Sequence, residues 1–267
     1  MEKISGQKDP IIQLLRELGS EDGRRRNNRF FAEGEELVKR AFDYGGEVDC
    51  LIFTDKFAAS DAGQALAQRA ASAGKRSFYT TEGLLSKILE AKPTPECLAI
   101  VERKVVQLSD VIGIERPLIQ MVERGENADN LGMLLRSTDA AGMTGVILTA
   151  TTDPFARRVV RGSRGAVFTT PICIQQDTAK VISEAKASGI QVIATSANTD
   201  VIHTSIDFTK PTMIIAGNEH VGISDTARDL ADAVVRIPML GRINSLNIAV
   251  AASLVMYEAV RQRLSKK

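Results

Sequence analysis

The sequence predicts an α/β protein, because short apolar stretches of strand length alternate with helical stretches along most of the chain. In the first half, strand-like stretches at residues 48–53, 77–80 and 97–101 are separated by Ala-rich helical stretches. In the second half, strand 118–122 runs through a polar loop and a helix into strand 146–148. Such a unit joins parallel strands with a right-handed crossover.

Composition is consistent with this fold class and excludes several others. The chain has 267 residues, 44% hydrophobic and 25% charged, which allows one large or two modest domains and excludes a disordered chain. Three cysteines without a C-x-x-C pair exclude a disulfide scaffold and a zinc ribbon. No apolar run approaches the roughly 20 residues that span a bilayer, and the first residues lack the apolar core of a signal peptide. We therefore expect a cytoplasmic, soluble protein.

The first elements indicate a small α/β sandwich. Residues 10–18 carry an apolar stripe at helical spacing, and a second helix is expected at 35–42. Helices at 58–73 and 82–91 lie between the three strands. The mixed polar stretch before Pro117 resembles a linker. The predicted organisation is a first domain at 1–104, a linker at 105–115 and a second domain at 116–267.

Four arginines lie within six residues of the first domain: Arg24, Arg25, Arg26 and Arg29. One interpretation is a solvated loop. The other is contact with nucleic acid, because guanidinium groups pair well with phosphates and are costly to crowd together without anions. The net charge of +1 does not decide between these two interpretations.

Three loops of the second half concentrate glycine and polar residues after strands. The first, residues 123–132, precedes a helix at 133–141 that ends at Gly142. The second follows strand 213–216, and the third follows strand 234–237. A further strand at 191–195 and helices at 178–187 and 224–230 complete the alternation. Ligands of open α/β sheets bind beyond the carboxyl ends of strands, so the three loops could share one pocket.

The final helix, expected at residues 245–264, is apolar around most of its circumference. Such a helix is buried in a core or against a partner. A terminal helix has few neighbours of its own, so this pattern favours a subunit interface. Its apolar residues are Leu246, Ile248, Val250, Ala251, Leu254, Val255 and Met256.

Common nucleotide and hydrolase signatures are missing. The sequence contains neither G-x-G-x-x-G nor G-x-x-x-x-G-K-[ST], which disfavours a dinucleotide-binding dehydrogenase and a P-loop enzyme. The segment at 162–165 is one residue too short for a G-x-S-x-G elbow. His203 and His220 have no metal-ligand spacing with another His or Cys, so no metal site is expected.

The three loops together resemble the SpoU (TrmH-like) branch of the SPOUT RNA methyltransferases. The resemblance rests on N-x-G-x-x-x-R from Asn130 to Arg136, G-N-E at 217–219, and I-P-M with S-L-N at 237–239 and 245–247. It covers about residues 117–263, including R-G-S-R-G-A at 161–166. The pattern R-x-x-x-x-F-x-E-G at 26–34 is similar to the L30e-like domain that precedes many of these enzymes. His220 departs from the family, where many members carry glycine.

The resemblance implies a mostly parallel sheet with a C-terminal trefoil knot, a homodimer, and methyl transfer from S-adenosylmethionine to an RNA ribose 2′-hydroxyl. It favours 23S rRNA as substrate, with tRNA or a non-catalytic RNA-binding protein as alternatives. The implied catalytic residues are Arg136, Asn130, Glu219, Ser245 and Asn247. The implied donor-binding residues are Gly217, Asn218, Glu219, Ile237, Met239, Leu240, Ser245 and Leu246. RNA contacts are expected at Arg24, Arg25, Arg26, Arg29 and Arg164, with no metal and no membrane involved.

Each singled-out residue also has a structural interpretation. Arg136 could form a surface ion pair, and Asn130 could be a turn residue. Glu219 could be the carboxylate near the start of helix 224–230. Ser245 could cap the last helix, which would leave Asn247 in the first turn with its side chain able to reach the site.

Overall fold

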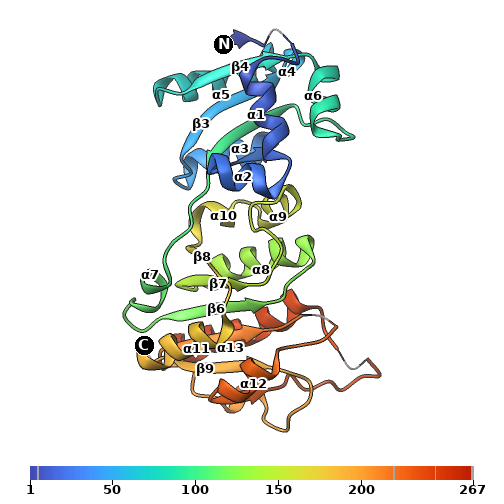
Figure 1. Ribbon diagram of the computed structural model, residues 1–267. Helices are drawn as coiled ribbons and strands as arrows, with labels where there is room; N and C mark the ends of the chain where they lie inside the picture. Colours follow the sequence, from blue (N-terminus) through green and yellow to red (C-terminus); the bar gives the residue numbers. More distant parts are fainter. Residues whose placement is uncertain (5, 219, 244, 266–267) are drawn as a thin grey trace. The chain divides into compact units, whose positions relative to one another are not determined.

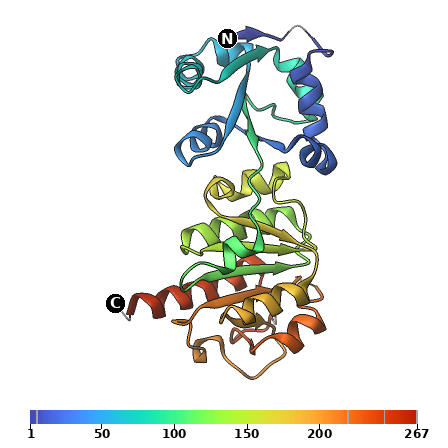
Figure 2. The same cartoon turned by 60° about the vertical axis from the view of Figure 1, so that its left-hand side comes forward.

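The computed structural model describes residues 1–4, 6–218, 220–243 and 245–265 (Figures 1 and 2). The chain divides into two compact units. Unit 1 comprises Met1–Arg103 and Phe155–Thr169, and unit 2 comprises Lys104–Pro154 and Thr170–Lys267. The predicted boundary after residue 104 therefore lies one residue from the observed one. However, the segment at 155–169 packs with unit 1, which local sequence patterns did not indicate.

Unit 1 is a five-stranded mixed sheet in the order β1-β4-β3-β5-β2. β5 is antiparallel to both of its neighbours, and the other two pairings are parallel. The strands are β1 (Glu2–Lys3), β2 (Arg29–Glu33), β3 (Val48–Thr54), β4 (Arg76–Thr80) and β5 (Cys97–Glu102). The helices are α1 (Pro10–Leu18), α2 (Glu21–Asn27), α3 (Glu35–Asp43), α4 (Asp55–Ala58), α5 (Asp61–Ser72), α6 (Glu82–Leu89), α9 (Arg157–Ser163) and α10 (Ala166–Thr169).

The arginine cluster does not form a loop. Ser20 caps α2 by accepting from the Gly23 amide, and Asn28 ends the helix in the left-handed conformation, so three of the four arginines are helical. The fourth, Arg29, begins β2, a strand that sequence patterns missed. Helix formation follows from the Ser cap and the acidic first turn, both of which favour a helix N-terminus.

Unit 2 is built on a six-stranded sheet in the order β11-β9-β10-β6-β7-β8, and every pairing in it is parallel. The mostly parallel sheet that the family resemblance implied is therefore confirmed, while the trefoil knot stays a prediction. The strands are β6 (Leu118–Glu123), β7 (Gly145–Thr149), β8 (Ile172–Gln175), β9 (Gln191–Thr195), β10 (Thr212–Ala216) and β11 (Ala233–Val235).

Helices cover both faces of this sheet. α8 (Ala128–Ala140) and α13 (Ile248–Ser265) pack against each other, α8 against β7 and α13 against β10 (Figure 2). α7 (Leu108–Ile112), α11 (Thr178–Ala187) and α12 (Asp225–Leu230) share a buried core with alternate residues of the strands. The short 3-10 helix η1 (His203–Ser205) precedes β10. No helix in the described residues is both long and apolar enough to cross a bilayer.

The prediction that residues 105–115 form a linker is wrong. They include α7, whose Leu108 and Val111 are buried in the core of unit 2. The carboxylate of Asp110 accepts from the Gln107 amide and helps to cap this helix. Six of the eleven residues in this segment are apolar, but α7 has only five residues, which is too short for a helical period to be recognised in the sequence.

α8 begins five residues earlier than predicted. Asn127 caps it by accepting from the amides of Asp129 and Asn130, at 2.9 and 3.1 Å. Asn130 and Gly132, which were predicted to lie in the preceding loop, therefore lie within the helix. Asp129 in the first turn adds favourable charge at the positive end of the helix.

α13 also differs from the prediction. The Asn247 side-chain oxygen caps α13 by accepting hydrogen bonds from the backbone amides of Ala249 and Val250, so the predicted capping role of Ser245 is wrong. Only part of the circumference is buried. Val250, Leu254 and Tyr257 are 48%, 45% and 49% exposed, and we call them the apolar stripe.

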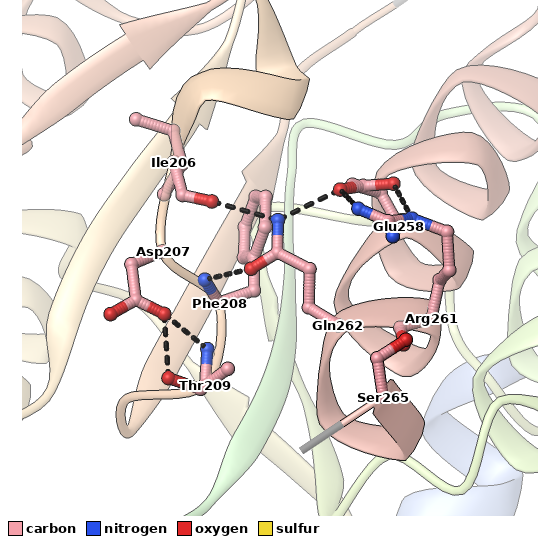
Figure 3. A network of polar contacts seen from close by, with 8 residues as sticks. All are labelled: Ile206, Asp207, Phe208, Thr209, Glu258, Arg261, Gln262 and Ser265. Atoms are coloured by element: carbon pink, nitrogen blue, oxygen red, sulfur yellow. Dashed lines mark hydrogen bonds and ion pairs between the residues drawn. The ribbon is translucent and has the colours of Figure 1, made fainter.

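A polar network fixes the far end of α13 to the loop before β10 (Figure 3). The Gln262 amide group donates to the Ile206 carbonyl and accepts from the Phe208 amide, at 2.9 Å each. Arg261 donates to both carboxylate oxygens of Glu258 at 2.8 and 2.7 Å. These bonds, chiefly those of Arg261, lower the pKa of Glu258 to about 2.

Candidate active site

The candidate site lies at the carboxyl edge of the parallel sheet, where β6 and β10 are neighbours. The chain leaves β6 in one direction toward β7 and β8, and the other three strands lie on the opposite side. Ligands bind at such a switch point because the loops diverge there and leave a crevice. Two of the three loops that the sequence singled out follow β6 and β10 directly.

The loop after β10 is tightly specified by its own residues. A Cβ at Gly217 would lie 2.3 Å from the Gly222 carbonyl carbon and the Ile223 nitrogen, so only glycine fits. Asn218 and Gly222 exchange two backbone hydrogen bonds. The Asn218 side chain accepts from the His220 amide at 2.8 Å and donates to the Arg124 carbonyl at 2.9 Å. Asn218 thus fixes the loop and joins it to the end of β6.

Glu123, at the end of β6, makes a second connection that sequence reasoning missed. Its buried carboxylate accepts from the Ser224 amide at 2.8 Å, the Ser224 hydroxyl at 2.7 Å and the Thr178 hydroxyl at 2.9 Å. A buried carboxylate is tolerated when its oxygens are satisfied in this way. An acidic residue ending an apolar strand was the available signal.

A cavity of about 300 Å³ opens beside the loop after β10. The predicted donor-binding residues Gly217, Asn218, Ile237, Met239, Ser245 and Leu246 all line it. Leu240 does not line the cavity and is 98% exposed, because its side chain points into solvent. Glu219 lies outside the described residues.

One wall of the cavity was not predicted from the sequence. It is formed by residues 195–198, at the end of β9 and directly after it, together with His220 and Arg228. The Arg228 guanidinium donates to the Ser196 hydroxyl at 3.3 Å. The polar run after a predicted strand could have identified this wall, because it occupies the same sheet edge as the other loops.

The cavity lining fits a nucleoside. Ile237, Met239 and Leu246 offer apolar surface for a flat base, and Ser196 and Asn198 offer hydroxyl and amide groups for a sugar. The described residues bring together no group of three or more His, Cys, Asp or Glu side chains suited to a metal ion.

Two predicted catalytic residues meet beside this cavity. The Asn247 side-chain amide donates to the Asn130 side-chain oxygen at 2.8 Å, although the residues are 117 positions apart. Asn247 caps α13, and Asn130 lies in the first turn of α8. Arg136 lies on α8 less than two turns after Asn130, and its side chain is exposed.

The predicted RNA contacts of unit 1 occupy different environments. Arg24 is buried, and its guanidinium donates to the carbonyls of Leu18 and Gly19, so it completes the end of α1 rather than presenting a phosphate contact. Arg29 pairs with Asp49 and Glu102. Arg25 and Arg26 are exposed, and Arg25 lies 3.9 Å from Glu21.

Comparison with known proteins finds relatives that match both units of the chain. Residues 9–99 match an MRM3-like substrate binding domain. A 23S rRNA (uridine(2479)-2′-O)-methyltransferase from Streptomyces viridochromogenes is 31% identical over 93% of this chain and 88% of its own length. A 23S rRNA (guanosine(2553)-2′-O)-methyltransferase from Bacillus subtilis is 26% identical over 96% and 98%. A crystal structure of an AdoMet-bound rRNA methyltransferase from Sinorhizobium meliloti has a TM-score of 0.86 and 31% identity, covering 97% of both chains. Residues 117–257 match the SpoU rRNA Methylase family, and the chain belongs to that family.

Proposed function

We propose that this protein transfers a methyl group from S-adenosylmethionine to a ribose 2′-hydroxyl of 23S rRNA. The observation that carries the proposal is the bond between Asn130 and Asn247. It joins the helix that presents Arg136 to the helix whose first residues border the cavity. The names of the two relatives support 23S rRNA as the substrate.

The reaction requires an in-line arrangement of donor and acceptor. A carbon–sulfur bond breaks, a carbon–oxygen bond forms, and the 2′-hydroxyl loses its proton. When bound, S-adenosylmethionine supplies an electrophilic methyl group on a sulfonium. The residues of the cavity hold the donor, and the Asn130–Asn247 pair fixes the position of α8, which carries Arg136. Holding donor and acceptor in place in this way raises their effective concentration and so the rate of transfer.

Arg136 is proposed to bind the phosphate beside the acceptor ribose. Its guanidinium carries five donors and remains protonated in proteins, so its contribution is charge and orientation rather than proton acceptance. The departing proton then passes to another group or to water. In this arrangement Arg136 acts most strongly when negative charge develops on the attacking oxygen.

We further propose a homodimer that works in the cytoplasm, where rRNA is available. The apolar stripe on α13 supports the dimer, because three half-exposed apolar side chains on successive turns are typical of a contact surface. α13 begins at Asn247, so the same helix would connect the subunit interface with the site.

The test is methyl transfer with a product analysis. Purified protein is incubated with methyl-labelled S-adenosylmethionine and in vitro transcribed 23S rRNA, or with tRNA in a parallel reaction. After alkaline hydrolysis, 2′-O-methylation leaves label in alkali-resistant dinucleotides, which is the expected result for rRNA. Label in tRNA alone would change the substrate. Donor and RNA binding without transfer to either RNA would favour the non-catalytic alternative.

A further inference from the structure

Two short helices of unit 1 carry clustered arginines, and their charges are arranged differently. α2 has Glu21 and Asp22 in its first turn and its arginines in its last turn. This order complements the helix dipole, which favours anions at the N-terminus and cations at the C-terminus. Helix stability alone therefore accounts for the α2 arginines.

α9 has the opposite arrangement. Arg157 and Arg158 occupy its first turn, no acidic residue is present there, and Ala156 provides no side-chain cap. Cations at the positive end of a helix are unfavourable, by about 0.3–1 kcal/mol each at an exposed position. Positions where a chain violates local stability rules are expected to be functional sites.

The opposite side of α9 is firmly packed. Val159 and Val160 are buried, and the ring of Phe155 lies 5.1 Å from that of Phe30. Arg157 forms an ion pair with Glu33. Burial raises the pKa of the Glu33 carboxyl, and Arg157 opposes that rise. This packing and the ion pair hold α9 in place on its inner side.

The outward residues are Arg158, Arg161 and Arg164, which are exposed and recur every three positions. We call them the arginine face. Side chains three apart on a helix are neighbours, so the first two guanidinium groups lie on one side. Arg164 follows at the end of the helix, with its side chain 52% exposed and 3.4 Å from Glu36.

Arg164, like Arg116 and Arg124, has its backbone in the left-handed region. Its φ is 53°, in the left-handed region where an ordinary residue costs roughly 1–2 kcal/mol and glycine or asparagine is favoured. Its carbonyl accepts from the Arg40 guanidinium, which holds this conformation. An arginine is thus present at a position where local conformation alone would favour a smaller residue.

From these observations we infer that the arginine face of α9 binds the phosphate backbone of the RNA substrate. The inference rests on the proposed function, and it adds Arg158 and Arg161 to the expected RNA contacts. Guanidinium forks pair with phosphate oxygens and release condensed counterions on binding. By the same reasoning, the α2 arginines contribute less to RNA affinity than the α9 arginines.

The test compares two matched double variants, R158Q/R161Q on α9 and R25Q/R26Q on α2. Each removes two exposed arginines from one short helix of the same unit. Filter binding to in vitro transcribed 23S rRNA is measured from 50 to 200 mM KCl. R158Q/R161Q should bind at least tenfold more weakly at 100 mM, and its log–log salt slope should be shallower by about 1.4–1.8. R25Q/R26Q should change affinity less than threefold.

Further measurements keep the outcome specific. R161Q alone should show about half of the slope change of the double variant. R161K should bring the slope back close to that of the wild type, because lysine keeps the positive charge. Thermal melting checks folding, and if the double variant is unstable, the R161Q and R161K pair decides. Wild-type affinity and slope in the α9 variants, or a larger loss on α2, would overturn the inference. In those cases the wild type would still bind and methylate RNA, whereas failure of the proposed function would abolish wild-type methyl transfer itself.

Discussion

The two loops that border the candidate cavity are built in different ways. The loop after β10 is fixed by close backbone approach at Gly217 and by the side-chain bonds of Asn218. In the loop after β11, which covers residues 236–247, Leu240 and Ile243 are 98% and 71% exposed. The loop after β10 is therefore held by contacts within the chain, whereas the loop after β11 presents apolar side chains to solvent.

This difference indicates which part of the site is preorganised. Contacts of Gly217, Asn218 and Gly222 within the chain hold the first loop, so it can contribute binding energy with a smaller ordering cost. The second leads directly into the cap of α13, whose apolar stripe is also exposed. These apolar groups lie outside the cavity lining, so a second copy of the chain, rather than the donor, would cover them.

Gly217→Ala should damage the preorganised loop severely. The added methyl would meet backbone atoms at 2.3–2.4 Å, and relieving such overpacking typically costs about 1–3 kcal/mol. We expect affinity for S-adenosylmethionine, measured by calorimetry, to fall roughly tenfold or more. Gly241→Ala in the other loop is the matched control, because a Cβ there meets nothing within 4 Å. Equal effects of the two substitutions would remove the contrast between the loops.

The sequence predicted this site better than it predicted the first unit. Gly217, Ile237 and Leu246 were identified through the motifs that resemble the SpoU family, whereas the glycine and polar runs after parallel strands indicated only the sheet edge where the site lies. The Asn130–Asn247 contact could not be read from local patterns, because it joins residues 117 positions apart. Arg24 was misassigned because burial of an arginine against helix carbonyls depends on tertiary packing.

Val250→Glu with Leu254→Glu should separate subunits if a second copy covers the apolar stripe. Light scattering at micromolar concentration should then give a dimer for the wild type and a monomer for this variant. Donor affinity should weaken as well, because α13 continues from the loop after β11. Val201→Glu replaces a valine that is 41% exposed elsewhere in unit 2 and should leave both measurements unchanged. A monomeric wild type would contradict the proposed assembly.

Glu258→Gln should affect stability without affecting the donor site. The folded-state pKa of Glu258 is about 2, below its ordinary value of 4.5. Its ionised form therefore stabilises the fold above pH 4.5, and this contribution is lost as pH falls from 4.5 toward 2. We expect the variant to lose about 1 kcal/mol at pH 7 and to show a flatter acid limb in denaturant titrations. A changed donor affinity would show that the polar network of Glu258 at the far end of α13 influences the donor site.

The proposed role of Arg136 in the reaction is measured by single-turnover methyl transfer with Arg136→Ala. With saturating S-adenosylmethionine and 23S rRNA, the account predicts a rate at least 100-fold below wild type, with donor affinity nearly unchanged. An interaction made mainly in the transition state is seen in the rate rather than in ground-state binding. Arg158→Ala, at the remote phosphate contact, should approach the wild-type rate once RNA is saturating. A near wild-type rate for Arg136→Ala would contradict the account.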